Sequence, residues 1–421
     1  MLRKLFSIDL AAFKHRDFRL MFGAGSISMF GSMLTYVTAP LQIAQITKSY
    51  VAVGIIGLIE IGPLIVFGIW GGAIADSMNR KKVVVLTELG LGLATTILLI
   101  NALSDEPKVM VIYTVTFLYA VLDGIQRPSL GALLPQVVPT ELLTSASAVN
   151  SLRWNFGSIV GPSLGGFIAA TAGPAFAYGI DAFTYLIATF LFLKMSAKAA
   201  ESTKEPIDVK MMFSGFNYAK SRPDLLGTYS IDIIAMVLAF PNALFPFMAI
   251  EFDAPWSLGL LYASMSVGAL IASATSGWTA KIHHQGKAIV LAATVWGLAM
   301  ALTGLAPNIY FALFGLLIAG CADMISGLFR MLIWNTTIPL SMRGRLGGIE
   351  MLSYSIGPQL GQIRSNFVAQ LFSLRVSLIS GGIICSAGSV AVGRGLKQLW
   401  NFDTRTNEYA ISERIARGET A

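Results

Sequence analysis

Charged residues are scarce in this sequence. Asp, Glu, Lys and Arg make up 13% of its 421 residues, whereas they make up about a quarter of a water-soluble globular protein. Hydrophobic residues reach 55%, and apolar runs of about 20 residues, long enough to cross a bilayer, follow one another with few interruptions. This composition excludes a water-soluble domain and, despite a net charge of +7, a nucleic-acid-binding protein. It predicts an all-α membrane protein embedded in a lipid bilayer.

Cysteine and histidine are also rare. The two cysteines lie in apolar segments and predict no disulfide framework. The three histidines lie in polar segments, at positions 15, 283 and 284, so no imidazole is expected at membrane depth. Residues 161–165 match the Gly-x-Ser-x-Gly pattern of hydrolases, but that turn needs a strand before it and a histidine base. We therefore expect no enzyme, no metal site and no cofactor.

Hydropathy predicts twelve membrane spans, at residues 18–46, 51–75, 82–103, 108–137, 142–171, 175–195, 225–250, 257–280, 287–306, 308–338, 346–371 and 376–398. An even number places both termini on one side. Of the 30 Lys and Arg residues, 23 fall on that side, three on the other and four inside spans. The positive-inside rule then predicts that both termini are cytoplasmic.

The longest polar stretch divides the spans six and six. This predicts a cytoplasmic lead-in (1–17), a bundle (18–195), a linker (196–224), a second bundle (225–398) and a cytoplasmic tail (399–421). The halves look duplicated: Gly-Pro-Ser-Leu-Gly at 161–165 recurs as Gly-Pro-Gln-Leu-Gly at 357–361, and Asp123 recurs as Asp323. Parallel six-helix repeats, related by a pseudo-two-fold axis normal to the membrane, form the major facilitator fold.

The segment after the second span, from Gly72 to Lys82, resembles the loop 2–3 signature of the major facilitator superfamily. The resemblance implies that Gly72 lets helices approach closely and that Asp76 and Arg80 close a cytoplasmic gate. The alternative is a basic loop that only orients the chain in the membrane. In the second half, Lys281 stands where the aspartate should be, so a gate there must differ.

Span five carries Gly157, Gly161, Pro162 and Gly165. This pattern resembles the antiporter signature of the same superfamily, which implies export rather than import. The alternative is a plain packing face, because small residues four positions apart let membrane helices approach each other in any bundle. The two interpretations are compatible.

Carboxylates inside spans are costly and suggest function. Asp123 has Arg127 four residues later, so it forms either an intrahelical ion pair or part of a site. Glu60, Asp232 and Glu350 have no partner in their own spans. We expect one of Glu60, Asp123, Asp232 and Glu350 to carry a coupling proton. Asp181 is expected to lie near the outer end of its span, in contact with water.

Four arginines also fall inside spans, and a guanidinium offers a fixed fork to a carboxylate. They suggest a cavity for an anionic or polyhydroxylated small molecule. Span eleven is too polar to face lipid over its whole surface, which indicates that part of it lines a transport path or a network between helices. The candidate cavity residues are Arg127, Arg153, Asp323, Arg330, Gln359, Gln362 and Arg364.

Four segments, 37–47, 71–83, 157–166 and 344–348, resemble siderophore exporters of the drug:proton antiporter-3 branch of this superfamily. Gly31 is followed by Ser32, whereas macrolide pumps of that branch carry Gly-Asp there. The resemblance implies a monomeric, proton-gradient-driven exporter of a siderophore or a similar polar metabolite, working by alternating access. The alternative is a multidrug or macrolide-type efflux pump with the same fold.

Overall fold

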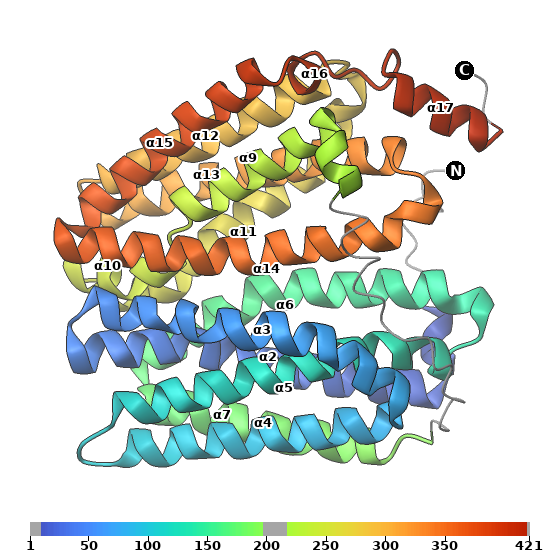
Figure 1. The fold of residues 1–421 in the computed structure, drawn as a ribbon. Helices are drawn as coiled ribbons and strands as arrows, with labels where there is room; N and C mark the ends of the chain where they lie inside the picture. The colour runs from blue at the N-terminus through green and yellow to red at the C-terminus, as the bar shows by residue number, and fades with distance from the viewer. Residues whose placement is uncertain (1–9, 197–216, 419–421) are drawn as a thin grey trace. The chain divides into compact units, whose positions relative to one another are not determined.

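The computed structural model describes residues 10–196 and 217–418, except for the side chains of 68, 69, 72–77, 155, 340, 341, 343–345 and 347–355 (Figure 1). The described chain is helical throughout and contains no strand. It divides into two compact units, Met1–Lys48 with Ile59–Ile207, and Ser49–Leu58 with Asp208–Ala421. The expectation of an all-α membrane protein is confirmed.

Unit 1 contains six long helices, of which α3 begins within unit 2. They are α2 (Arg16–Thr47), α3 (Tyr50–Ser77), α4 (Arg80–Leu103), α5 (Val109–Val137), α6 (Leu143–Thr171) and α7 (Pro174–Leu193). Two short 3₁₀ turns, η1 (Ala11–Lys14) and η2 (Thr140–Leu142), precede α2 and α6. In this unit α2 packs on α6 and α7, and α4 packs on α5 and α7.

Unit 2 repeats this arrangement. Its helices are α9 (Pro223–Ala239), α10 (Phe245–Glu251), α11 (Leu258–Ala274), α12 (Gln285–Gly304), α13 (Ile309–Thr337), α14 (Leu340–Leu371), α15 (Leu374–Gly395), α16 (Lys397–Trp400) and α17 (Glu408–Ala416). Short turns η3 (Asn242–Leu244), η4 (Pro255–Ser257) and η5 (Ser276–Lys281) connect some of them. Here α9 packs on α14 and α15, and α12 packs on α13 and α15, which are the pairs expected from the repeat.

Ten helical segments of the described chain are long and apolar enough to cross a membrane. Two further long helices, α6 with 29 residues and α14 with 32, include side chains outside the described residues. Together these segments are compatible with the twelve predicted spans. One predicted span is not a continuous helix, because α9 ends at Ala239 and α10 begins only at Phe245. Pro241 lacks an N–H and disfavours the helical conformation of the residue before it, so the helix stops there.

The repeated glycines make the same contact in both units. A Cβ on Gly161 of α6 would lie 2.6 Å from Cβ of Met33 on α2, and one on Gly357 of α14 would lie 3.0 Å from Cβ of Met236 on α9. One turn later, Gly165 and Gly361 lie against the backbone of those same partner helices. Small residues are needed here because the two helix backbones approach too closely for a side chain.

Helix α7 shows how a membrane-spanning helix is oriented. Its exposed side chains include Phe176, Phe183, Leu186 and Phe190. Its buried face carries the polar residues Asp181 and Thr184. This is the reverse of a water-soluble helix, because hydrocarbon solvates the apolar face and polar groups must find partners inside the bundle.

Candidate functional site

A polar layer crosses the interior of unit 1. Glu88 of α4 is 1% exposed, and its carboxylate accepts a hydrogen bond from the amide nitrogen of Gln126 on α5. The guanidinium of Arg153 on α6 lies directly over Gly25 of α2, so close that a Cβ added to Gly25 would stand 2.0 Å from Arg153 Nη1. The same guanidinium attracts Glu88 electrostatically. Arg153 is half-buried, and its Nε has no hydrogen-bond partner in the described chain.

A second polar layer surrounds Asp181, which is fully buried. Its Oδ2 accepts hydrogen bonds from the hydroxyls of Thr35 on α2, Tyr119 on α5 at 3.1 Å and Thr95 on α4 at 3.4 Å. Thr184, one turn later on α7, lies 3.4 Å from the other oxygen. The expectation that Asp181 is in contact with water is therefore wrong.

The two layers share helix α4. Glu88 and Thr95 are seven residues apart and therefore face the same side, about 10 Å apart along the axis. Gly25 and Gly31 of α2 leave space for the two layers, because a Cβ on Gly31 would meet Oδ1 of Asp181 at 2.4 Å. The interior of unit 1 thus holds two carboxylates, one beside an arginine and one among hydroxyls.

Unit 2 holds a buried ion pair between helices. Asp232 of α9 pairs with Arg330 of α13, and the two side chains are 2% and 4% exposed. Asp323, two turns earlier on α13, lies 4.0 Å from Arg330 Nη2 and is 41% exposed. The sequence offers Asp232 no basic partner in its own span, and the fold supplies Arg330 from another helix.

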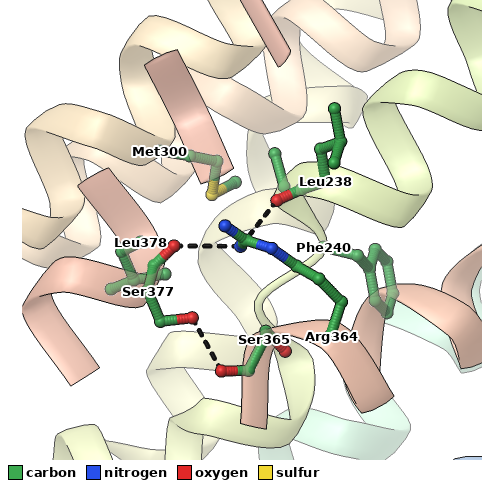
Figure 2. A pocket seen from close by; sticks show the side chains of 8 residues that line it. Leu238, Phe240, Met300, Arg364, Ser365, Ser377 and Leu378 are labelled. Atoms are coloured by element: carbon green, nitrogen blue, oxygen red, sulfur yellow. Dashed lines mark hydrogen bonds between the residues drawn. The ribbon is translucent and has the colours of Figure 1, made fainter. Parts of the chain in front are cut away.

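Arg364 of α14 lies where α9 is interrupted (Figure 2). Its Nη1 donates to the carbonyls of Leu238 at 2.9 Å and Ser377 at 3.0 Å, and its Nη2 donates to Ser380 Oγ at 3.0 Å. The last carbonyls of a helix have no partner within it, and in a membrane they must be satisfied by protein. Arg364 thus joins α9, α14 and α15.

The cavity beside Arg364 is small. It measures about 10 Å³ and is lined by Leu238, Phe240, Met300, Ser377 and Leu378 among others. That is room for about one water molecule, so it does not hold a siderophore. Nearby, Ser365 accepts at its carbonyl from Ser377 Oγ at 2.7 Å. Gln362 is also buried, and its carbonyl accepts from Asn366 Nδ2 at 2.9 Å. This part of α14 forms a network between helices.

The other predicted residues are dispersed. Asp123 and Arg127 form the intrahelical ion pair, at 2.6 Å, with side chains 35% and 49% exposed. Glu60 of α3 is half-buried and attracts Arg127. Gln359 of α14 lies against Gly57 of α3, and a Cβ added to Gly57 would stand 2.9 Å from the backbone carbonyl oxygen of Gln359.

The loop 2–3 motif is only partly described. The surroundings of Gly72 and the side chains of Asp76 and Glu350 lie outside what the structure describes. Arg80 donates to the carbonyl of Ala132 near the end of α5, at 3.2 Å. Lys81 donates to the carbonyl of Leu193, the last residue of α7, at 2.9 Å. Lys81 therefore satisfies the carbonyl end of α7, and Arg80 joins α4 to α5, both within unit 1.

The span-five glycines form a packing face on α2. Gly157 faces Met29, with a Cβ position 2.7 Å from its methyl group, and Gly161 and Gly165 continue the contact toward Met33 and Leu34. Pro162 lies inside the same helix, α6.

Sequence reasoning did not select Glu88 or Asp181 as a candidate functional carboxylate. Glu88 and Asp181 lie inside apolar spans, which was a sufficient signal, but most of their partners come from other helices: Gln126 for Glu88, and Thr35, Thr95 and Tyr119 for Asp181. In the described part of the chain, no three His, Cys, Asp or Glu residues gather as metal ligands.

Comparisons with known proteins agree with this architecture. A family model described as transmembrane secretion effector matches residues 7–407. The Enterobactin exporter EntS of Citrobacter koseri is 28% identical over 361 residues, covering 85% of this chain and 87% of that protein. The protein of the same name from Escherichia coli O81 is 28% identical over 348 residues, covering 82% and 84%.

Solved structures share the fold at low identity. The nucleoside transporter NupG is 12% identical with a TM-score of 0.70, covering 92% of this chain and 99% of that one. The peptide transporter POT in complex with sulfate is 11% identical with a TM-score of 0.66, covering 92% and 96%. The family match, the helical repeat and the apolar spans lead to one conclusion. The chain belongs to the transmembrane secretion effector family of the major facilitator superfamily, and it is a multi-pass membrane transporter.

Proposed function

We propose that this transporter exports a siderophore, or a similar polar or anionic metabolite, in exchange for protons. The observation that carries the proposal is the similarity to enterobactin exporters over 85% of this chain and 87% of the relative. Similarity of that extent includes both units, so it reflects the whole transport machine rather than one shared motif. The polar interior of unit 1 supports a polar substrate.

Arg153 is the arginine best suited to contact an anionic substrate. Arg364 uses its guanidinium on two carbonyls and a hydroxyl, and Arg330 pairs with Asp232 in the buried core of unit 2. Arg153 is half-buried and keeps a donor, Nε, without a hydrogen-bond partner among the described residues. A guanidinium donor left over in a polar interior favours carboxylate or another anion. Gln126 and Glu88 complete this proposed contact region.

The transport cycle that we propose is alternating access driven by the proton gradient, without a cofactor. Asp76 and Arg80 close the gate on the cytoplasmic side of a bacterial inner membrane. Both termini of the chain lie on that side. The protein works as a monomer. In this cycle an intramembrane carboxylate binds a proton from outside and releases it into the cytoplasm as substrate leaves.

The test uses an Escherichia coli strain that lacks its own enterobactin exporter. Under iron limitation, mass spectrometry measures enterobactin in the supernatant and inside the cells. The wild-type gene should restore secretion and reduce intracellular enterobactin. Arg153→Gln should reduce secretion about tenfold, the equivalent of about 1.4 kcal/mol of lost substrate interaction, and Asp76→Asn should abolish it.

Arg375→Gln is the matched control for Arg153→Gln, because Arg375 is half-exposed and pairs with Glu251 at 3.3 Å. It should secrete at the wild-type level. A wild-type protein that reaches the membrane without restoring secretion would contradict the proposal. Growth inhibition by a panel of drugs would then test the alternative of a multidrug or macrolide-type efflux pump.

A further inference from the structure

The buried environment of Asp181 has an unusual composition. The carboxylate is fully buried, and it accepts hydrogen bonds from the hydroxyl groups of Thr35, Thr95, Tyr119 and Thr184. They come from four helices, α2, α4, α5 and α7. In the described chain no lysine or arginine forms an ion pair with Asp181, whereas Asp232 in unit 2 has Arg330. A charged carboxylate in such a place is expensive.

Hydroxyl partners suit both protonation states of a carboxyl group. A serine, threonine or tyrosine hydroxyl can donate to a carboxylate, and after rotation it can accept from a carboxylic acid. An arginine partner cannot make that change, because it only donates and it stays charged. The surroundings of Asp181 therefore satisfy its hydrogen bonds before and after protonation, while those of Asp232 favour the charged form alone.

The charged and titratable neighbours of Asp181 are few. Helix α2 presents Gly31 and Thr35, α5 presents Tyr119, and α7 itself presents Tyr178 and Tyr185. Helix α4 adds a second carboxylate, Glu88, on which the charge of Asp181 acts. The cation of α6, Arg153, acts on Glu88. The interior of unit 1 therefore holds two carboxylates and one arginine close to these hydroxyls.

Tyr119 is the least buried partner of Asp181. It is half-buried, and its hydroxyl contacts both Asp181 and Thr95. We propose that Asp181 is a reversible proton-binding site of unit 1, reached past Tyr119 and used in the transport cycle. In this step one O–H bond forms on the carboxylate when the proton arrives, and the same bond breaks when the proton leaves. The use in transport rests on the proposed function, but proton binding does not.

The first experiment needs no substrate. Infrared difference spectra of the full chain in lipid nanodiscs are recorded between acidic and alkaline pH. The wild type should show a protonated-carboxyl band that disappears as the pH rises, and Asp181→Asn should lack that band. Asp123→Asn, which changes a half-exposed ion pair, should keep it. Spectra of Asp181→Asn that match the wild type at every pH, or a band that never titrates, would overturn the proposal.

A second variant covers the case in which Asp181→Asn does not fold. Thr95→Val keeps the carboxylate but removes a hydroxyl that contacts both Asp181 and Tyr119. It should displace the midpoint pH of the band. An unchanged midpoint would argue against Asp181 as its source.

The transport arm uses proteoliposomes loaded with enterobactin. Asp181→Asn should still exchange labelled for unlabelled enterobactin across the membrane. Its rate of enterobactin transport driven by a pH gradient should be at least tenfold lower than that of the wild type. Equal pH-driven transport by Asp181→Asn and the wild type would refute the coupling role. A wild type that moves no enterobactin would refute the proposed function instead, and the infrared result would still decide proton binding.

Discussion

The buried pair Asp232–Arg330 offers the sharpest test of how unit 2 is held together. Asp232→Asn keeps the shape of the side chain but removes its charge, which leaves Arg330 charged and 4% exposed. Breaking a buried pair by removing one partner costs about 3–5 kcal/mol. Asp323 at 4.0 Å offsets part of this cost, but it is 41% exposed and therefore screened by solvent. We expect a loss of about 3 kcal/mol in the free energy of unfolding.

The assay is an SDS titration of the purified full chain in lipid–detergent mixed micelles, followed by tryptophan fluorescence. Asp123→Asn is the matched control, because it makes the same chemical change in an intrahelical pair that is 35% and 49% exposed. Such a pair is worth about 0.3–0.5 kcal/mol. The double variant Asp232→Asn/Arg330→Met should recover most of the loss, because an apolar replacement leaves no buried charge.

Equal stability of Asp232→Asn and Asp123→Asn would refute this reasoning, because burial is the property that separates the two pairs. A double variant no more stable than Asp232→Asn would refute the second step, that the cost comes from the uncompensated cation. Either result would mean that water reaches Arg330 inside unit 2.

Four further predictions concern stability. Arg364→Gln should cost about 3 kcal/mol or more, since hydrogen bonds from charged groups contribute about 1.5–3 kcal/mol each and Leu238 and Ser377 would lose donors; thermal unfolding with Arg375→Gln as control measures it. Gly320→Ala should destabilise the protein, because the added Cβ would lie 1.8 Å from the carbonyl oxygen of Met265. Gly131→Ala is the opposite case, because its added Cβ would meet nothing within 4 Å, and it should stabilise α5 by about 0.5–1 kcal/mol in the same assay. Tyr409→Ala should cost about 1–2 kcal/mol and speed proteolysis of the C-terminal segment after Trp400, because the Arg222 guanidinium lies 3.3 Å from that ring centroid, and Tyr409→Phe should not. Hydrogen bonds from Arg405 lower the pKa of Asp403 to about 2, so the ionised Asp403 stabilises the C-terminal segment fully above its unfolded pKa of about 3.9, and this stabilisation is lost as the pH falls toward 2. Proteolytic cleavage after Trp400 should therefore be faster in Asp403→Asn than in the wild type already at pH 7. An Asp403→Asn variant that resists cleavage as well as the wild type would contradict this prediction.

Much of the fold was readable from local features of the sequence. Apolar runs identify the spans because each helix must match the thickness of the hydrocarbon, whatever its neighbours are. The glycine repeat was also readable, since Gly161 and Gly357 stand at equivalent places in duplicated units and both pack on a methionine. The break after Ala239 was missed, although Pro241 was the local signal for it.

The partners of polar side chains were not readable, because they lie on other helices. Asp232 and Arg330 are 98 positions apart, and the hydroxyls around Asp181 come from positions 35, 95 and 119 as well as 184. A hydropathy profile reports how apolar a span is, but not which face of each helix points inward. The residues by themselves therefore determined the all-helical class, the apolar spans and the duplication, since those follow from local hydrophobicity and spacing. Which buried charge is neutralised by an arginine, and which is left among hydroxyls, was decided only when the helices packed, because that depends on the rotation of each helix against its neighbours.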